Sequence, residues 1–292
     1  MTPSTAASRS ARGFATLAAA FAAFPGAKVL DARDEAAFAR GHVEGAGRLS
    51  PGEFVPRRAE LPSREQPVLV VHDEPAGARE AAEALAVLGY AHLAWLDGRL
   101  DREPEGHASR ADAARLWSPG AFIEREALRA RDARAGSRPG RALDLACGSG
   151  RAAVFLALSG FEAEGWDVDE SALERARALA KRHGASVRFT PADLEHEPPP
   201  DPDPAFDLIV VVRYLHRPLF PWIERALAPG GALLYETFRD GQQRFGRPRR
   251  ARHLLRTGEL LTAFPSLVVE RHEETPDGAP PLLARLVARK RG

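Results

Sequence analysis

A glycine-rich turn between an apolar strand and a helix constrains this chain more than any other feature. The run Ala142–Ala146 is largely apolar, Gly148 and Gly150 follow it, and a helical pattern begins near Arg151. Glycine has no Cβ, so the backbone can turn sharply there and approach a ligand closely. The N–H groups at the helix start then face the space above the strand end. This arrangement predicts a site for an anionic or polar ligand at the carboxyl edge of an open α/β sheet.

Two aspartates beside the turn narrow the choice of ligand. The spacing of the small residues also fits a dinucleotide fingerprint, which is a weak signal by itself. Asp144 lies inside the strand, where it can steady the glycine loop or meet a cationic group of a ligand. Asp167 ends the next predicted strand, 161–167, where a carboxylate can accept both hydroxyls of a ribose. These acids argue against a nicotinamide dinucleotide and for another ligand that contains a nucleoside. The remaining alternative is a glycine turn that binds no ligand.

The stretch from Asp144 to Gly150 resembles the first motif of the class I S-adenosylmethionine-dependent methyltransferases, which reads Asp-x-x-Cys-Gly-x-Gly in many members. The resemblance covers nearly all of residues 116–292. It implies a Rossmann-like α/β sheet whose last strand is antiparallel, and S-adenosylmethionine as the cofactor. The family often has glycine where Ala146 stands, so alanine is a mild departure.

The resemblance also implies which residues contact the cofactor. They lie at the ends of four predicted strands or just after them and are Asp144, Ala146, Gly148, Gly150, Asp167, Val168, Asp193, Leu194 and Val212. The first four surround the methionine end through backbone groups, and the next two hold the ribose and the adenine face. Asp193 and Leu194 meet the adenine amino edge, and Val212 flanks the sulfonium. The alternative for each acid is a solvated surface charge or a helix cap.

The segment after the predicted strand 206–212 supplies the candidates for catalysis: Arg213, Tyr214 and His216. Methyl transfer from a sulfonium is an in-line displacement with a neutral leaving group, so the protein mainly supplies proximity and alignment. A general base is needed only where the acceptor carries a proton. His216 is the candidate base, Tyr214 the orienting group and Arg213 an anion-binding group. The alternatives are a surface histidine, a packed tyrosine and a solvated arginine.

The same segment, together with Tyr235–Phe238, resembles the tellurite-resistance-type branch of these methyltransferases. That branch includes enzymes acting on small oxyanions or thiols, so we predict a small-molecule acceptor. An RNA or protein acceptor is the alternative, because arginines crowd residues 241–253. Nucleic acid is not favoured, since the formal net charge is only +1 and a plain solvated loop explains the arginines equally well. The sequence predicts no metal site.

The first third of the chain resembles a rhodanese domain. The pattern Asp-x-Arg-x-x-x-x-Phe-x-x-Gly-His-x-x-Gly-Ala spans Asp31 to Ala46. In that family a cysteine after the central strand carries the sulfur, but here Asp73 stands at the expected position and the chain's one cysteine is Cys147. A carboxylate cannot carry a sulfane sulfur, so we expect no sulfur transfer. A regulatory or docking role, including a non-catalytic sensor of an anion or partner, and a retained folding partner both remain open.

We therefore predict a two-domain α/β protein. A rhodanese-like parallel-sheet domain occupies 1–105, a charged linker 106–115 and the methyltransferase domain 116–292. One cysteine fits a reducing compartment, no apolar run is long enough to span a bilayer, and residues 16–24 fit a short helix better than a targeting segment. We expect a cytoplasmic protein without membrane contacts, and the sequence leaves the oligomeric state open.

Overall fold

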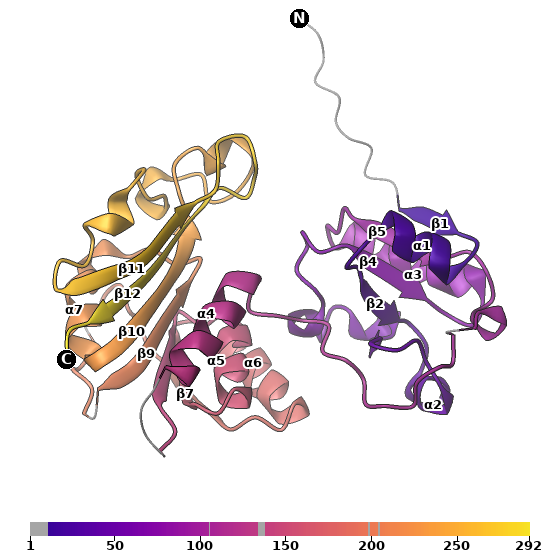
Figure 1. Ribbon diagram of the computed structural model, residues 1–292, viewed down its shortest axis with the longest axis horizontal. Helices are drawn as coiled ribbons and strands as arrows, with labels where there is room; N and C mark the ends of the chain where they lie inside the picture. Colours follow the sequence, from indigo (N-terminus) through magenta and orange to yellow (C-terminus); the bar gives the residue numbers. More distant parts are fainter. Residues whose placement is uncertain (1–10, 105, 134–137, 198, 204) are drawn as a thin grey trace, which may run out of the picture. The chain divides into compact units, whose positions relative to one another are not determined.

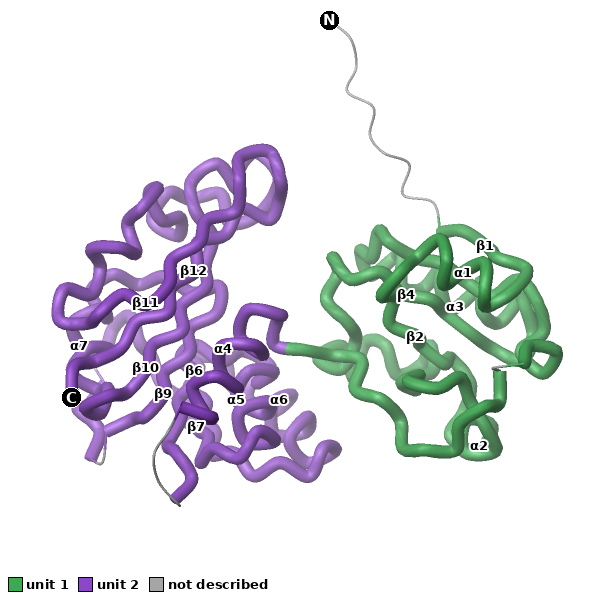
Figure 2. Tube along the Cα trace, in the orientation of Figure 1, with its two compact units in different colours: residues 1–118 green, residues 119–292 purple. Residues whose placement is uncertain are grey.

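The chain forms two compact units, residues 1–118 and 119–292 (Figure 2). We describe a computed structural model over residues 11–104, 106–133, 138–197, 199–203 and 205–292. The division falls after Ser118, rather than within the predicted linker 106–115. The physical reason is packing, because Leu116 is buried in a core cluster of unit 1 and the N–H of Ala114 donates to the carbonyl of Ala46.

Unit 1 is built on a five-stranded sheet in which every paired strand is parallel, as predicted. Its strands, in the order β1-β5-β4-β2-β3, are β1 (Arg12–Phe14), β5 (Leu93–Leu96), β4 (Val68–Val71), β2 (Lys28–Asp31) and β3 (Gly47–Arg48). Its helices are α1 (Leu17–Ala23), α2 (Glu35–Arg40) and α3 (Pro75–Val87). The central strand β4 is wholly buried, with Val68 and Val70 in the core cluster that includes α3, and Leu69 and Val71 in the cluster that includes α1 and α2.

Unit 2 contains a seven-stranded mixed sheet in the order β11-β12-β10-β9-β6-β7-β8 (Figure 1). The strands are β6 (Arg141–Leu145), β7 (Glu162–Asp167), β8 (Val187–Pro191), β9 (Phe206–Val212), β10 (Leu227–Phe238), β11 (Leu267–Glu274) and β12 (Leu283–Lys290). The last strand, β12, runs antiparallel to both of its neighbours, and every other pair is parallel. This arrangement confirms the predicted Rossmann-like sheet with an antiparallel last strand.

Helices cover both faces of the unit 2 sheet. They are α4 (Ala121–Asp132), α5 (Arg151–Leu158), α6 (Glu170–Arg182) and α7 (Phe220–Ala226). Helix α5 contacts both α4 and α6, while α7 packs into the core cluster on the opposite face with Leu143 and Leu145 of β6. Strand β10 already pairs with β9 at Leu227 and shifts register before Ala232.

None of the helices in the described ranges combines the length and the apolar character that a bilayer crossing requires.

Candidate active site

The glycine turn lies between β6 and α5, at the carboxyl edge of the sheet. Gly148 and Gly150 have φ angles of 52° and 76°, which side chains other than glycine rarely adopt. A Cβ on Gly150 would lie 2.6 Å from the Cβ of Ala176, so the turn packs directly on α6. A Cβ on Gly148 would meet no atom within 4 Å. The turn is therefore closed against the protein at Gly150 and open at Gly148, where a ligand can approach.

Two residues other than glycine also have left-handed backbones among those that the structure describes: Ala146 at φ 58° and Arg213 at φ 57°. They follow β6 and β9, which pair side by side through Leu145 and Val211. Such conformations cost about 1–3 kcal/mol each and cluster at functional sites. Both strained positions thus border the same stretch of the carboxyl edge.

Asp144 is buried and holds the start of α5 in place. Its Oδ2 accepts the N–H of Ala153 at 2.9 Å. Burial raises the pKa of Asp144 to about 7, and the nearby charge of Asp167 adds to the rise. Of the two roles the sequence allowed, this geometry supports steadying the glycine turn, since the carboxylate satisfies a helix N–H rather than facing the open edge.

Asp167 at the end of β7 is half-buried and joins two backbone turns. One carboxylate oxygen accepts the N–H of Gly148 at 2.7 Å, and the other accepts the N–H of Asp169 at 2.9 Å. A carboxylate oxygen has more than one lone pair, so both can still accept hydroxyl donors. The neighbouring Val168 is 67% exposed and offers an apolar surface beside this carboxylate.

The turn after β8 brings a third acid to the edge. Burial acts to raise the pKa of Asp193, but the N–H groups of Glu195 and His196 and the His196 ring outweigh it, and the pKa is lowered. Leu194 is 7% exposed and belongs to the core cluster, so its side chain packs inside the domain. The side chain of Leu194 thus lies in the core, and the cofactor contact that the resemblance implied for this residue stays a prediction.

The hydroxyl of Tyr214 is buried and has no hydrogen-bond partner among the described residues. Burial raises the pKa of Tyr214, and the charges of Glu195, Asp193 and Asp167 add to the rise. An unsatisfied buried polar atom costs about 1–3 kcal/mol unless a partner arrives. Because three acids of the carboxyl edge act on this hydroxyl, it is a candidate partner for a polar ligand at that edge.

The segment after β9 places the predicted catalytic residues together. Arg213 is exposed, its N–H donates to the Glu236 carbonyl at 2.7 Å, and its guanidinium lies over the Phe238 ring at 5.6 Å. The Tyr214 carbonyl accepts the Tyr235 hydroxyl at 3.0 Å. Strand β10 thus fixes the backbone of this segment.

His216 and Val212 are partly exposed in the same segment. Arg217, by contrast, is engaged with the protein. Its guanidinium donates to Glu259 and to the carbonyls of Arg252 and Leu254. Arg217 therefore has a structural role. The contribution of Glu259 was missed from the sequence because it lies 42 positions away and no local pattern links the two.

Glu236, near the end of β10, pairs with Arg285 at 2.6 Å and is 6% exposed.

In unit 1 the loop after β4 contains an internal ion pair. Arg33 is buried, binds both oxygens of Asp31 and donates to Asp73 at 2.9 Å. Asp73 stands at the position where the resemblance implied a cysteine, and its carboxylate contributes to neutralising Arg33. This contact supports a structural role for Asp31 and Arg33.

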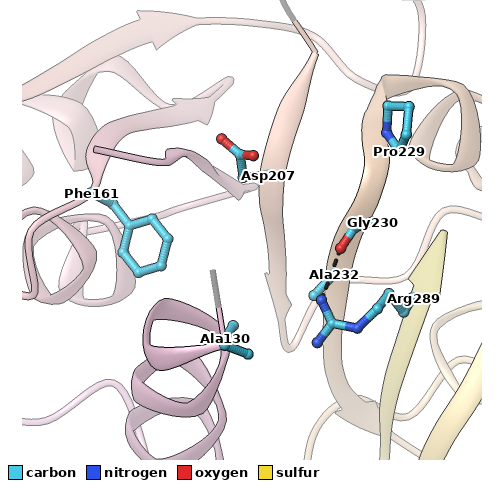
Figure 3. A pocket seen from close by; sticks show the side chains of 8 residues that line it. Ala130, Phe161, Asp207, Pro229, Gly230, Ala232 and Arg289 are labelled. Carbon is cyan, nitrogen blue, oxygen red and sulfur yellow. Dashed lines mark hydrogen bonds between the residues drawn. The ribbon is translucent and has the colours of Figure 1, made fainter. Parts of the chain in front are cut away.

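Two pockets lie at the opposite, amino edge of the unit 2 sheet. The first is about 270 Å³ and is lined by residues at the end of α4 and the amino ends of β9 and β10. Figure 3 shows Arg289 beside Gly230 on one side of this pocket, opposite Phe161 and Ala130. The Arg289 guanidinium donates to the Gly230 carbonyl at 2.8 Å. The second is about 420 Å³ and lies beside Arg141 and Ser186. Neither pocket adjoins the glycine turn, so neither is part of the candidate site.

Family models place two known domains on the chain. A rhodanese-like domain matches residues 15–101, and a methyltransferase domain matches residues 142–231. The chain joins a rhodanese-like domain to a methyltransferase domain. The methyltransferase match begins at β6 and contains the glycine turn, Asp167, Asp193 and the segment after β9. This domain implies S-adenosylmethionine as the cofactor.

Individual proteins resemble parts of this chain. Ribosomal protein L11 methyltransferase of Thermus thermophilus is 43% identical over 107 residues, or 35% of this chain and 41% of its own length. The chain therefore spans about two fifths of that relative. The structure of TehB from Haemophilus influenzae has a TM-score of 0.47 and 17% identity, covering 57% of this chain and 62% of its own. A Mesorhizobium loti S-adenosylmethionine-dependent methyltransferase has a TM-score of 0.45 and 24% identity, covering 57% and 98%.

Proposed function

We propose that the methyltransferase domain transfers a methyl group from S-adenosylmethionine to an acceptor held beside the carboxyl end of β9. The observation that carries the proposal is the composition of this edge. It combines a glycine turn open at Gly148, the Asp167 carboxylate beside it and a buried Tyr214 hydroxyl without a partner. An adenosyl ligand with a cationic end matches these groups, because it brings hydroxyl donors, polar ring atoms and a positive charge to an edge bearing acids.

Each residue of the proposed site has a role that its position supports. Asp167 accepts the ribose hydroxyls, and Val168 packs against the adenine. Asp193 borders the adenine amino edge. Asp144 acts indirectly, because it fixes the helix start that shapes the turn. The cofactor, when bound, supplies an electrophilic methyl group on a sulfonium. Because its leaving group is neutral, the main contribution of the protein is alignment.

Arg213, Tyr214 and His216 form the proposed acceptor side. Arg213 holds an anionic group, Tyr214 orients the acceptor and His216 accepts a proton where the acceptor carries one. The first candidate acceptor is a small molecule of the oxyanion or thiol type, which the exposed guanidinium of Arg213 suits. A macromolecular acceptor, RNA or protein, is the second candidate. The exposed arginines after β10 favour RNA, and the name of the Thermus thermophilus relative favours protein.

We propose that the rhodanese-like domain has no sulfurtransferase activity and serves regulation or docking. The support is the absence of cysteine from residues 1–118 and the pairing of Asp73 with Arg33. A non-catalytic sensor of an anion or partner and a retained folding partner are the alternatives. A thiosulfate–cyanide assay of the whole protein tests the first point. We expect no turnover above the uncatalysed rate, and measurable turnover would contradict the assignment.

The acceptor is tested with S-adenosylmethionine carrying a radiolabelled methyl group. The whole protein is incubated with separate pools of oxyanions, thiols, RNA and protein extract, and label transfer is counted in each pool. His216→Gln is the matched variant, because it keeps a polar side chain of similar size but cannot accept a proton at neutral pH. We expect label in the small-molecule pools and slower transfer by the variant. Label confined to RNA or protein would establish the second candidate instead.

A further inference from the structure

The segment that follows β10 carries an unusual concentration of positive charge. Residues 241–256, which we call the basic segment, contain no aspartate or glutamate and six arginines: Arg244, Arg247, Arg249, Arg250, Arg252 and Arg256. The chain as a whole has a formal net charge of +1, so this surface is far more basic than the average of the molecule. The basic segment begins beyond the carboxyl end of β10 (Figure 1).

Most of this charge is not used inside the protein. The side chains of Arg247, Arg249 and Arg250 are exposed, and in the part of the chain that the structure describes they form no ion pair. Other arginines of the domain are paired, such as Arg239 with Asp277 at 2.7 Å and Arg285 with Glu236 at 2.6 Å. The unpaired guanidinium groups of the basic segment are therefore available for an external anion.

The backbone of the basic segment is nevertheless anchored. The buried Gln242 accepts the N–H of Leu282 at 2.8 Å, and its amide group donates to the carbonyl of Arg247 at 3.4 Å. Leu254 and Leu255 are buried at the other end. Because the backbone is already ordered, the conformational entropy lost on binding a ligand would come mainly from the arginine side chains.

The basic segment also borders the acceptor side of the proposed site. Arg217 donates to the carbonyls of Arg252 at 3.1 Å and Leu254 at 3.0 Å. Arg217 directly follows His216 in the chain. The Arg252–Leu254 end of the basic segment therefore lies beside Arg217, the residue that follows His216.

The chemistry of this surface fits a phosphate backbone with accessible bases. Guanidinium groups bind phosphates through paired hydrogen bonds. Phe245 is 49% exposed among the arginines and offers a ring on which an unpaired base can stack. A membrane surface would call for a broader apolar face, and an acidic peptide would make no specific use of the aromatic ring.

We infer that the basic segment binds single-stranded RNA. The inference concerns binding and goes beyond the proposed methyl transfer, so each can fail without the other.

The test is fluorescence anisotropy of the whole protein with a labelled single-stranded RNA of mixed sequence, measured over a range of KCl concentrations. The test variant changes Arg247, Arg249 and Arg250 to Gln. The control variant changes Arg177, Arg182 and Arg188 to Gln, which removes the same charge from exposed positions elsewhere in the domain. Phe245→Ala is a second test variant that removes the ring and leaves the charge unchanged. Thermal melts establish that the variants are folded.

We expect the test variant to bind RNA at least tenfold more weakly than the control variant. Its salt dependence should be shallower by about two units of log Kd per log salt, because each phosphate contact on a single strand contributes about 0.7. Phe245→Ala should weaken binding severalfold without changing the slope. Equal affinity of the test and control variants would overturn the inference. So would competition by polyglutamate at the same charge concentration as effectively as by unlabelled RNA.

Discussion

The N–H of Gly148 donates to Asp167 at 2.7 Å, which joins the glycine turn after β6 to the end of β7. The contact matters because one residue follows β6, the other ends β7, and the two would hold different parts of one ligand. Gly148 belongs to the turn proposed for the methionine end, and Asp167 is proposed for the ribose. A single hydrogen bond thus sets the distance between the two halves of the proposed cofactor site.

Asp167→Ala should weaken S-adenosylmethionine binding by about 1–3 kcal/mol, which is about five- to 150-fold in Kd, because the ribose hydroxyls lose their acceptor. The ratio of the Kd of the variant to the Kd of the original protein measures the loss of binding free energy. Asp169→Ala is the matched control, because Asp169 is exposed and caps α6 through Ser171 at 2.9 Å. The control should keep its affinity and lose only about 1 kcal/mol of stability. Equal losses of affinity in both variants would argue against the ribose role.

Ala146→Gly should stabilise the folded protein or leave its stability unchanged, although glycine usually destabilises. At φ 58° alanine is strained by about 1 kcal/mol, and glycine relieves that strain while making the unfolded chain more flexible. Urea denaturation measures the free energy of unfolding. Ala152→Gly in α5 is the control and should cost about 1 kcal/mol. An Ala146→Gly variant as destabilised as this control would contradict the strain.

The buried Asp144 should make the protein less stable as pH rises from about 4 to about 7. Its pKa is about 7 in the folded state and 3.8 as the reference value, so the folded state binds more protons in this window. The free energy of unfolding therefore falls with rising pH, by a few kcal/mol at most for this group at about 1.4 kcal/mol per unit.

Asp144→Asn keeps an oxygen acceptor for Ala153 but does not titrate. The difference in unfolding free energy between pH 5 and pH 8 should be smaller in this variant than in the original protein. Identical differences would show that Asp144 does not contribute to the pH dependence.

The Arg217–Glu259 pair should couple energetically. Hydrogen bonding to Arg217 lowers the pKa of Glu259 to about 2, in spite of burial, which acts to raise it. A double-mutant cycle with Arg217→Met and Glu259→Gln should give a coupling of about 1–2 kcal/mol in the free energy of unfolding at pH 7. The coupling should decrease as the pH falls from about 4.5 toward 2, because Glu259 then takes up a proton. Additive effects at pH 7 would contradict the role assigned to Arg217.

Cys147 should react slowly with thiol reagents in the folded protein. Burial raises the pKa of its thiol, and the charges of Asp144 and Asp167 add to the rise, so little thiolate forms at neutral pH. The chain has no other cysteine, so alkylation by iodoacetamide can be followed by mass without ambiguity. The rate should increase at least tenfold in denaturant. A folded-state rate similar to that of a free thiol would contradict the claim that burial and the two aspartates suppress the thiolate of Cys147.

The parts of the fold that the sequence predicts well are those in which local pattern and tertiary structure agree. The strand at β9 and the glycine turn after β6 were correctly predicted, because a continuous apolar run and a tight turn leave clear signatures. The strands β1 and β3 were missed. They are three and two residues long, too short to show a period.

For the candidate site, too, the sequence predicted only the features that leave a local pattern. The sequence placed Asp144 inside one predicted strand and Asp167 at the end of the next, but their partners, Ala153 and Gly148, depend on how the turn folds. The core position of Leu194 could not be distinguished from an exposed one by its residue type. Long-range pairs such as Arg217 with Glu259 leave no local pattern, because each partner alone resembles a solvated charge.

The central claim is that the carboxyl edge of the methyltransferase sheet binds S-adenosylmethionine. Isothermal titration calorimetry of the whole protein with S-adenosylmethionine tests it most directly. We predict saturable binding of one molecule per chain, with Tyr214→Phe weaker than the original protein because the buried hydroxyl no longer contributes. The absence of saturable heat at millimolar S-adenosylmethionine, with a protein whose folding is confirmed by its thermal transition, would contradict the claim.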